Sequence, residues 1–296
     1  MKHILLIILS IFLSFTTLMA QDFWEVIEKP VNARIYSIEV KDTNMVFVGF
    51  GNDKGAYTYD AKHYIWKISG LESNSIYDLM VDDDGTVFAG TGGFVNLYRL
   101  FSIEEGWQPC YSFSSNIYCI ENDLHNTIFC GGGYGGALYR SLNNGNSWEQ
   151  VMTFGDGEIA NAMLFVDDTT AFTGTLDFQG IAGGVYRSID NGITWYHSGL
   201  QYEYISSLAI NSAGVIFGGS RGNYSEGGGG VFKSEDYGNT WTELTDAIWV
   251  TSIVIDTNDV IYVGAEINSG QGGVFRSEDN GLTWERIISG MGQYPS

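Results

Sequence analysis

Beyond residue 20, the apolar residues fall in short runs that are separated by clusters of turn-forming residues. Ile76–Val81 is one such run; an acidic turn at 82–85 follows it, and Val87–Gly90 is the next run. Glycine-rich loops lead to further runs such as Gly230–Lys233 and Gly273–Arg276. Short runs of β-branched and aromatic residues between turn signals are typical of antiparallel strands. The pattern therefore predicts an all-β chain without helices.

A unit of four such strands repeats along the chain. Seven of the eight tryptophans stand 41 to 47 residues apart, at positions 24, 66, 107, 148, 195, 241 and 284. A second series agrees, because the apolar residues at 35, 76, 117, 160, 205 and 250 each precede a glycine by fourteen residues. Units of about 40 to 50 residues with four short strands each predict a β-propeller of four-stranded antiparallel blades.

The number of blades is open between six and seven. Six units are complete, but Trp24 heads a strand that has no preceding partner strands. Residues 289–294 resemble residues 198–202, which lead into a following unit. We expect a seven-bladed ring whose last blade is incomplete in this sequence, which would then be part of a longer chain. The alternative is a six-bladed ring with a surplus edge strand that needs protection from pairing.

The turn before most of these tryptophans carries a shared motif. Residues 188–195, 234–241 and 277–284 read Ser-x-Asp-x-Gly-x-Thr-Trp, and residues 141–148 have Asn for Asp and Ser for Thr. Only a shortened remnant precedes Trp107, and the motif is lost before Trp66. With these motifs the chain resembles the Asp-box, or BNR-repeat, β-propellers. That family includes sialidases, xyloglucan hydrolases, sortilin-type receptors and photosystem-assembly-factor-like proteins, so the resemblance implies a fold more than an activity.

The repeated turn is predicted to be structural, because one active site cannot use four scattered copies. Asp and Ser side chains in such turns bond nearby backbone amides, and the tryptophan is expected to pack between blades. The resemblance also implies that this turn lies on the face opposite the ligand site. The residues assigned to this structural role are Asn143, Trp148, Asp190, Trp195, Asp236, Trp241, Asp279 and Trp284.

The first twenty residues have the layout of a cleaved secretory signal. Lys2 precedes a nearly unbroken apolar run, Ile4–Phe15, and Ala20 is the expected cleavage position. The run is about half the ~20 residues that a bilayer span needs. We expect a signal peptide over 1–20, a single propeller domain over 21–296, and a secreted or cell-surface protein. A retained N-terminal anchor is the alternative.

Net charge and cysteine content narrow the classes of ligand and partner that the protein is expected to bind. The formal net charge is −21, and the basic stripe that marks nucleic-acid binding is absent. Three cysteines are too few for a disulfide framework and lack metal-ligand spacing, so neither a metal nor a cofactor is predicted. Cys119 and Cys130 occupy first- and second-strand positions where other units carry mostly small residues. They could be two packed thiols or an oxidised cross-strand pair.

Enzyme motifs are weak in this sequence. Residues 131–136 fit a dinucleotide fingerprint, but a strand rather than a helix follows them. The resemblance to sialidases implies three substrate-binding arginines; four of the arginines recur at one repeat position, which leaves Arg34, Arg221 and Arg286. A glycoside hydrolase that uses a carboxylate pair stays open.

Function is expected on the loops between second and third strands and on the links between blades. These segments carry aromatic side chains beside acids, a combination suited to sugars or peptides. The candidate ligand-binding residues are Tyr134, Asp177, Phe178, Tyr202, Arg221, Tyr224, Glu226 and Glu266. We expect a secreted, non-enzymatic propeller that binds a protein or glycan ligand or serves as a structural module. The alternative is a secreted glycoside hydrolase of the Asp-box type.

Overall fold

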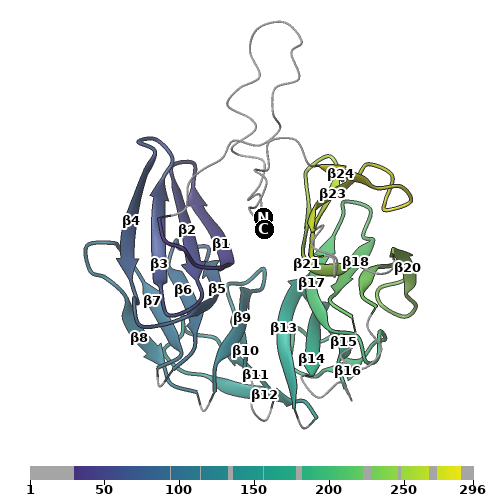
Figure 1. Cartoon of the computed structure of the whole chain (residues 1–296). Coiled ribbons are helices and arrows are strands. Elements are labelled where there is room, and N and C mark those ends of the chain that lie inside the picture. Colours follow the sequence, from purple (N-terminus) through teal and green to yellow (C-terminus); the bar gives the residue numbers. More distant parts are fainter. Residues whose placement is uncertain are drawn as a thin grey trace, which may run out of the picture.

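The computed structural model describes residues 30–93, 95–113, 115–132, 136–155, 157–177, 182–222, 228–245, 248–266 and 272–287. These residues form six four-stranded antiparallel sheets and contain no helix. The sheets are arranged around a common axis as the blades of a propeller (Figure 1). The predicted all-β propeller of four-stranded blades is therefore confirmed. Trp24 and residues 289–294, on which the expected seventh blade depends, lie outside the described residues.

The strands follow one another in simple chain order within each blade. The first three blades consist of β1 (Ile35–Asp42), β2 (Met45–Phe50), β3 (Gly55–Asp60) and β4 (Ile65–Gly70); β5 (Ile76–Val81), β6 (Val87–Thr91), β7 (Leu97–Leu100) and β8 (Gln108–Tyr111); and β9 (Ile117–Asn122), β10 (Ile128–Gly132), β11 (Ala137–Ser141) and β12 (Glu149–Thr153). The last three consist of β13 (Glu158–Phe165), β14 (Ala171–Asp177), β15 (Gly184–Ser188) and β16 (Tyr196–His197); β17 (Ile205–Ile210), β18 (Ile216–Ser220), β19 (Gly230–Ser234) and β20 (Thr242–Thr245); and β21 (Trp249–Ile255), β22 (Ile261–Glu266), β23 (Gly273–Ser277) and β24 (Glu285–Ile287).

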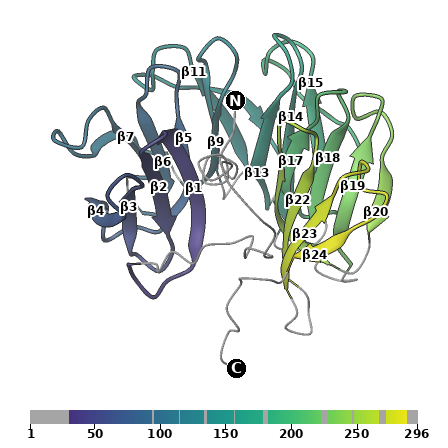
Figure 2. The same ribbon diagram turned by 90° about the horizontal axis from the view of Figure 1, so that it is seen from above.

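The first strand of each blade lies nearest the axis, and from β1 to β21 each of these strands packs against the next (Figure 2). The ribbons of β1 and β21 stand apart, so the first and sixth blades are separated in both views.

Within the part of the chain that the structure describes, no helix could cross a membrane.

Five apolar clusters hold successive blades together. Each contains a fully buried phenylalanine from a second strand and the tryptophan of the following blade. Phe47, for example, meets the edge of the Trp107 ring, with centroids 6.4 Å apart. These phenylalanines are Phe47, Phe88, Phe129, Phe172 and Phe217. The tryptophan spacing seen in the sequence is therefore the spacing of the interfaces between blades.

The turn before the tryptophan (the pre-tryptophan turn, residues 141–148, 188–195, 234–241 and 277–284) is closed by its own side chains. In the copy at 188–195, Asp190 Oδ1 accepts the Thr194 amide at 2.8 Å and Ser188 Oγ accepts the Gly192 amide at 2.9 Å. Trp195 Nε1 donates to the Gly192 carbonyl at 3.0 Å. The tryptophan is thus part of the turn. In five of the six described blades the fourth strand begins one residue after the tryptophan, so the tryptophan precedes the strand.

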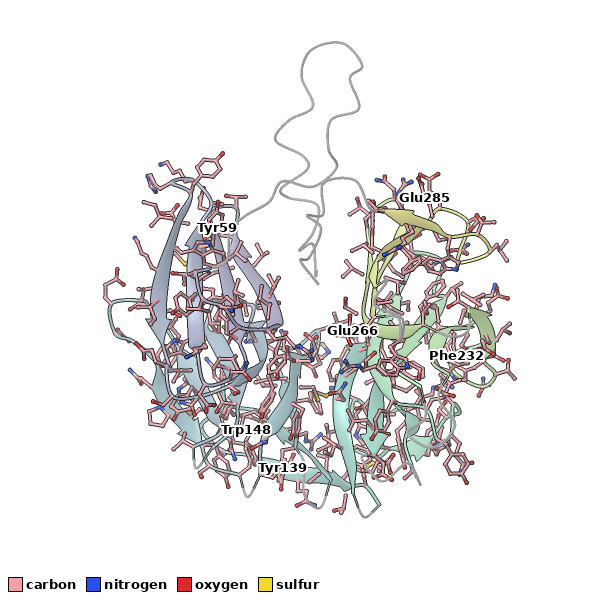
Figure 3. The ribbon with its side chains drawn as sticks, viewed as in Figure 1. Tyr59, Tyr139, Trp148, Phe232, Glu266 and Glu285 are labelled. Carbon is pink, nitrogen blue, oxygen red and sulfur yellow. The ribbon has the colours of Figure 1, made fainter. Side chains whose placement is uncertain are left out.

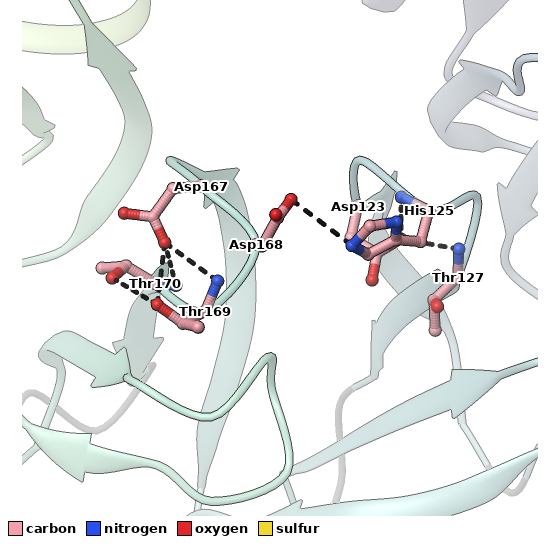
Figure 4. Close-up of polar contacts among 7 residues, drawn as sticks. All are labelled: Asp123, His125, Thr127, Asp167, Asp168, Thr169 and Thr170. Carbon is pink, nitrogen blue, oxygen red and sulfur yellow. Dashed lines mark hydrogen bonds and ion pairs between the residues drawn. The ribbon is translucent and has the colours of Figure 1, made fainter.

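A second set of carboxylate turns joins first and second strands at the same end of the blades, because neighbouring strands run in opposite directions. Asp123 Oδ1 accepts the amides of His125 and Thr127, and Asp167 Oδ1 holds its turn in a similar way. His125 Nε2 lies 3.3 Å from Asp168 Oδ1 and so bridges the third and fourth blades (Figure 4). Acidic residues at this end therefore serve local turn structure.

Acid should loosen the pre-tryptophan turns. Hydrogen bonds from the Thr283 hydroxyl and amide lower the pKa of Asp279 to about 2. The Thr240 bonds lower the pKa of Asp236; burial opposes the lowering at Asp190, where the bonds from Thr194 and Ser188 outweigh it. A depressed folded-state pKa stabilises the fold above the unfolded value, near 4, and this contribution is lost as pH falls through the folded value.

We expect the triple variant Asp190→Asn, Asp236→Asn, Asp279→Asn to lose less thermal stability than the parent between about pH 4 and pH 2. Asn143 shows that the amide is compatible with the turn, because its Oδ1 accepts the Ser147 amide at 2.8 Å. The melting temperature against pH is the measurement. Parallel curves for parent and variant would contradict the assignment.

Cys119 and Cys130 are present as thiols. In the β9–β10 register Cys119 is opposite Gly131 and Cys130 is opposite Ile120, so the two cysteines are diagonal neighbours on adjacent strands. Cys130 belongs to the cluster between the second and third blades and Cys119 to the next cluster. Their side chains thus lie on opposite faces of the sheet, and of the two expectations the packed thiols are observed.

Candidate functional site

A cavity of about 640 Å³ lies on the axis between the first strands. It is lined by residues of all six blades, most of them from first strands, and its volume falls within the usual range for ligand pockets. Arg34, Arg221 and Glu266 line one end of the cavity, here called its opening, where the starts of first strands and the ends of second strands meet. Glu266 is the last residue of β22 and is labelled in Figure 3. The opening therefore lies at the end of the blades opposite the carboxylate turns.

A β-bulge recurs in every first strand and shapes the cavity wall. The pairing register shifts across one residue of each, for example between Ile35 and Ser37 and between Ile76 and Asp78. A bulge leaves one residue outside the ladder and re-aims its side chain. The six bulged residues all line the cavity and are Tyr36, Tyr77, Tyr118, Asn161, Ser206 and Thr251.

Tyr36, Tyr77 and Tyr118, from three successive blades, form a continuous aromatic wall, here called the tyrosine arc. Tyr36 stacks on Tyr77 with centroids 5.8 Å apart and an interplanar angle of 18°, and Tyr77 meets Tyr118 at 4.8 Å. Burial, with smaller contributions from the neighbouring tyrosines, raises the pKa of Tyr77, so its hydroxyl stays protonated. Gly51 makes room, since a Cβ there would lie 2.4 Å from the Tyr36 ring.

The opposite wall is formed by Asn161, Ser206 and Thr251, and it is smaller and already hydrogen-bonded. Ser206 Oγ lies 2.6 Å from the Val250 carbonyl, Thr251 Oγ1 donates to Gly264 at 3.0 Å, and Asn161 Nδ2 donates to Ile205 at 3.3 Å. These bonds fasten each bulge to a neighbouring strand. The cavity is thus asymmetric, with ring faces and phenol hydroxyls on one side and small committed groups on the other.

Three charged residues gather at the opening. Arg221 lies 3.5 Å and Arg34 4.0 Å from the carboxylate of Glu266. The cluster joins the fifth, first and sixth blades, and all three side chains are exposed. Exposed pairs of this kind contribute little to stability, typically about 0–1 kcal/mol. Their polar groups are instead placed where an entering ligand would meet them.

Asp78 is a carboxylate that lines the cavity away from the opening, and it acts as a brace. Its Oδ1 accepts Ser37 Oγ at 3.0 Å and its own strand's Leu79 amide at 2.9 Å, while Oδ2 accepts the Ile120 amide at 2.9 Å. One side chain therefore ties together three successive first strands. A carboxylate held by three donors is suited to holding the cavity in shape.

The candidate residues from the sequence divide into three groups. Arg221 and Glu266 lie together at the cavity opening, Glu266 as the last residue of β22. Asp177 is fully buried and accepts the Ala182 amide at 3.0 Å, and Tyr202, although exposed, does not line the cavity. The remaining candidates, Tyr134, Phe178, Tyr224 and Glu226, lie outside the described residues.

The tyrosine arc was not anticipated from the sequence. Its members follow directly after the apolar residues at 35, 76 and 117 that define the repeat register. Tyrosine at the same repeat position in three consecutive units was the available signal. The bulge, which carries these side chains to the axis, leaves no mark in the residue pattern. Arg34 was considered only as a member of an arginine triad; it lies near Arg221 but is bridged to it by Glu266.

Fold and site together define a β-propeller with an aromatic-walled axial cavity, and the comparisons agree with the propeller fold. No protein-family model and no curated protein sequence matches the chain. Among solved structures, a GH74 xyloglucanase from Xanthomonas campestris has a TM-score of 0.71 at 16% identity, over 90% of this chain and 47% of that one. YCF48 from Cyanidioschyzon merolae has 0.64 at 15% identity, over 89% of both chains.

A further structure, YCF48 bound to D1 peptide, has a TM-score of 0.67 at 13% identity over 90% of this chain and 85% of that one. Identities this low show a shared fold alone. The chain spans less than half of the xyloglucanase chain and most of each YCF48 chain.

Proposed function

We propose that this chain is a secreted, non-enzymatic propeller of the Asp-box type whose axial cavity binds a protein or glycan ligand. The observation that carries the proposal is the tyrosine arc, three contacting rings presented to the cavity by repeated bulges. Aromatic rings provide large apolar contact, and phenol hydroxyls add hydrogen bonds at its edge. The four pre-tryptophan turns support the Asp-box assignment, and the signal-like residues 1–20 support secretion.

The similar structures include a xyloglucanase and a protein bound to a peptide, so both a glycan and a peptide are reasonable ligands. Hydrolysis of a glycosidic bond by the usual route needs two suitably placed carboxylates, one of them able to donate a proton. Three carboxylates line the cavity. Asp78 is braced by three donors, Glu266 lies between two arginines, and Glu121 accepts the Asn122 amide at 3.4 Å. This arrangement favours binding over catalysis. Release of reducing sugar from a polysaccharide panel would favour the hydrolase instead.

Replacing Tyr77 by alanine tests the proposal. The middle ring contacts both other tyrosines, so its loss should weaken binding by about tenfold or more, the scale of one aromatic contact. Arrays of glycans and of short peptides identify a ligand, and titration calorimetry gives the affinities. Tyr196→Ala, at an exposed tyrosine on β16, is the control and should bind like the parent. Equal affinities for all three proteins would overturn the cavity as the binding site.

A further inference from the structure

The outer strand of the first blade differs from the other five outer strands. β4 has six residues and is the longest fourth strand, and no strand of the described chain pairs with its outer side. It forms the outer edge of the first blade in Figure 1. An edge strand offers backbone N–H and C=O groups to an incoming strand, and proteins usually protect such edges with short strands, charged side chains or proline.

The other outer strands carry these protections, and β4 does not. Ile68, the second residue after the repeated tryptophan, is 53% exposed. The residues at the same place in the other blades are polar or proline, namely Pro109, Gln150, His197, Glu243 and Arg286. Ile65, the residue before the tryptophan, is 49% exposed, and its equivalents are Gly106, Ser147, Thr194, Thr240 and Thr283. Two exposed isoleucines therefore mark β4 as an unprotected edge.

The basic residue of this part of the repeat has a different place in the first blade. In the other five blades a third-strand arginine or lysine is in register with the residue after the tryptophan, as Arg140 is with Glu149. Three of these five cations form ion pairs within their own blade. In the first blade Thr58 takes the third-strand position, and Lys67 lies opposite it on β4. Lys67 is exposed and forms no ion pair with a described residue.

The turn that precedes β4 adds a second exposed lysine. Asp60 is the one carboxylate between residues 60 and 70, and its Oδ1 accepts the amides of Lys62 and His63, each at 3.1 Å. Asp60 Oδ2 lies 2.7 Å from His63 Nδ1. This carboxylate is therefore committed within the turn, and the Lys62 ammonium has no ion pair among the described residues. The edge is thus locally positive in a chain whose formal net charge is −21.

The backbone of β4 can accept another strand at Ile68. Pro109 occupies the equivalent position in β8 and stays in register with Tyr98, although proline has no backbone N–H. The amide at this position is therefore not needed for pairing inside a blade. In the fourth blade the next residue along, Ser198, donates its amide inward to the Val185 carbonyl. Because the amides of neighbouring strand residues point to opposite sides, the Ile68 amide faces the outer edge.

We propose that β4 binds an extended segment of a partner protein in which acidic and apolar residues alternate, and that this segment adds a fifth strand to the first blade. Successive side chains of a strand point to opposite faces, so Ile65 and Lys67 share one face of β4 and Trp66 and Ile68 share the other. Acidic residues of the added strand lie beside Lys67, and its apolar residues lie beside Ile68. Backbone hydrogen bonds supply affinity, and the alternating side chains supply specificity.

A second copy of this chain fits the edge less well than an acidic segment does. Pairing of β4 with β4 of another copy would place two copies of Lys67 on adjacent strands, where like charges are destabilising. Each copy also carries a formal net charge of −21. The edge lies on the outside of the first blade, whereas the candidate cavity lies on the axis, so this proposal goes beyond the proposed function and does not rest on it.

Two designed peptides test the charge preference of the edge. One peptide alternates valine and glutamate, the other alternates valine and lysine, and each carries a fluorophore for anisotropy titration with the full chain. The parent is expected to bind the glutamate peptide about tenfold more tightly than the lysine peptide. Lys67→Glu, which supplies the residue found after the tryptophan in the third and sixth blades, should remove this preference. Equal affinities of the parent for both peptides, or no binding of either, would overturn the proposal.

A proline substitution tests the backbone pairing. Ile68→Pro removes the outward amide, as Pro109 does in β8, and should weaken binding of the glutamate peptide by about tenfold or more. Gln150→Pro, the same change at the equivalent place of β12, is the matched control and should bind like the parent. Equal affinity of the parent and Ile68→Pro would contradict an added strand.

Analytical ultracentrifugation of the same proteins identifies the occupant. The parent is expected to sediment as the same species as Ile68→Pro in the absence of peptide. A dimer of the parent that dissociates in Ile68→Pro would show that a second copy occupies the edge, and it would overturn the proposal. If Ile68→Pro fails to fold, the response of Lys67→Glu to the two peptides decides the question.

Discussion

Replacing Phe129 by alanine is expected to lower the free energy of unfolding by about 3–5 kcal/mol, the usual cost of truncating a buried aromatic core residue. Phe129 is fully buried between the third and fourth blades, where its ring lies 4.8 Å from Phe165 and in the same cluster as Trp195. It also supports the pre-tryptophan turn, because the position of a Cβ on Gly192 is only 2.5 Å from its ring. The void left by the substitution would therefore lie beside this turn as well as within the apolar cluster.

Denaturant unfolding followed by tryptophan fluorescence measures this loss. Phe101→Ala is the matched control, since Phe101 is exposed at the end of the second blade's third strand and should cost about 1 kcal/mol or less. Equal destabilisation by the two substitutions would contradict the view that the phenylalanine–tryptophan contacts hold the blades together.

The fold was predictable because the tryptophans that mark its repeat pack between blades. This contact fixes the position of each tryptophan within its unit. Trp148 and Trp195 stand one blade apart, and each must reach the phenylalanine of the preceding blade, so the sequence spacing records the spatial spacing. Strand ends were less accurate, because Trp195 belongs to the turn through its bond to Gly192. The pattern of apolar and polar residues indicates which positions are buried. It does not reveal this hydrogen bond.

The candidate site was harder to predict, because its shape comes from backbone geometry. Tyr77 follows a buried residue and would read as an ordinary half-exposed strand position; only the bulge turns it to the axis. Conversely, Asp177 was chosen as an exposed loop carboxylate, whereas β14 continues through it and buries it. Arg221 and Glu266, predicted on the loops that follow second strands, lie together because the ends of these strands converge at one end of a propeller.

The open interface between the sixth and first blades predicts unequal responses to one substitution made at equivalent glycines. Gly174→Ala should lower the free energy of unfolding by about 1–3 kcal/mol, because its Cβ would lie 2.3 Å from Ile205 of the next blade and the backbone there is already packed. Gly264→Ala should cost less, about 0.5 kcal/mol, since the nearest atom is the Ser252 hydroxyl, which can rotate away. Neither glycine has the positive φ that would itself penalise alanine.

Thermal and denaturant unfolding of the parent and of both variants measure these losses in the free energy of unfolding. Because residue type, strand position and substitution are the same, the difference between them isolates contact with a following blade. If Gly264→Ala were as unstable as Gly174→Ala, the second strand of the sixth blade would be packed against a neighbour as tightly as that of the fourth blade. In that case the exposure of Ile35 and Ile38 would need a cause other than a missing neighbour.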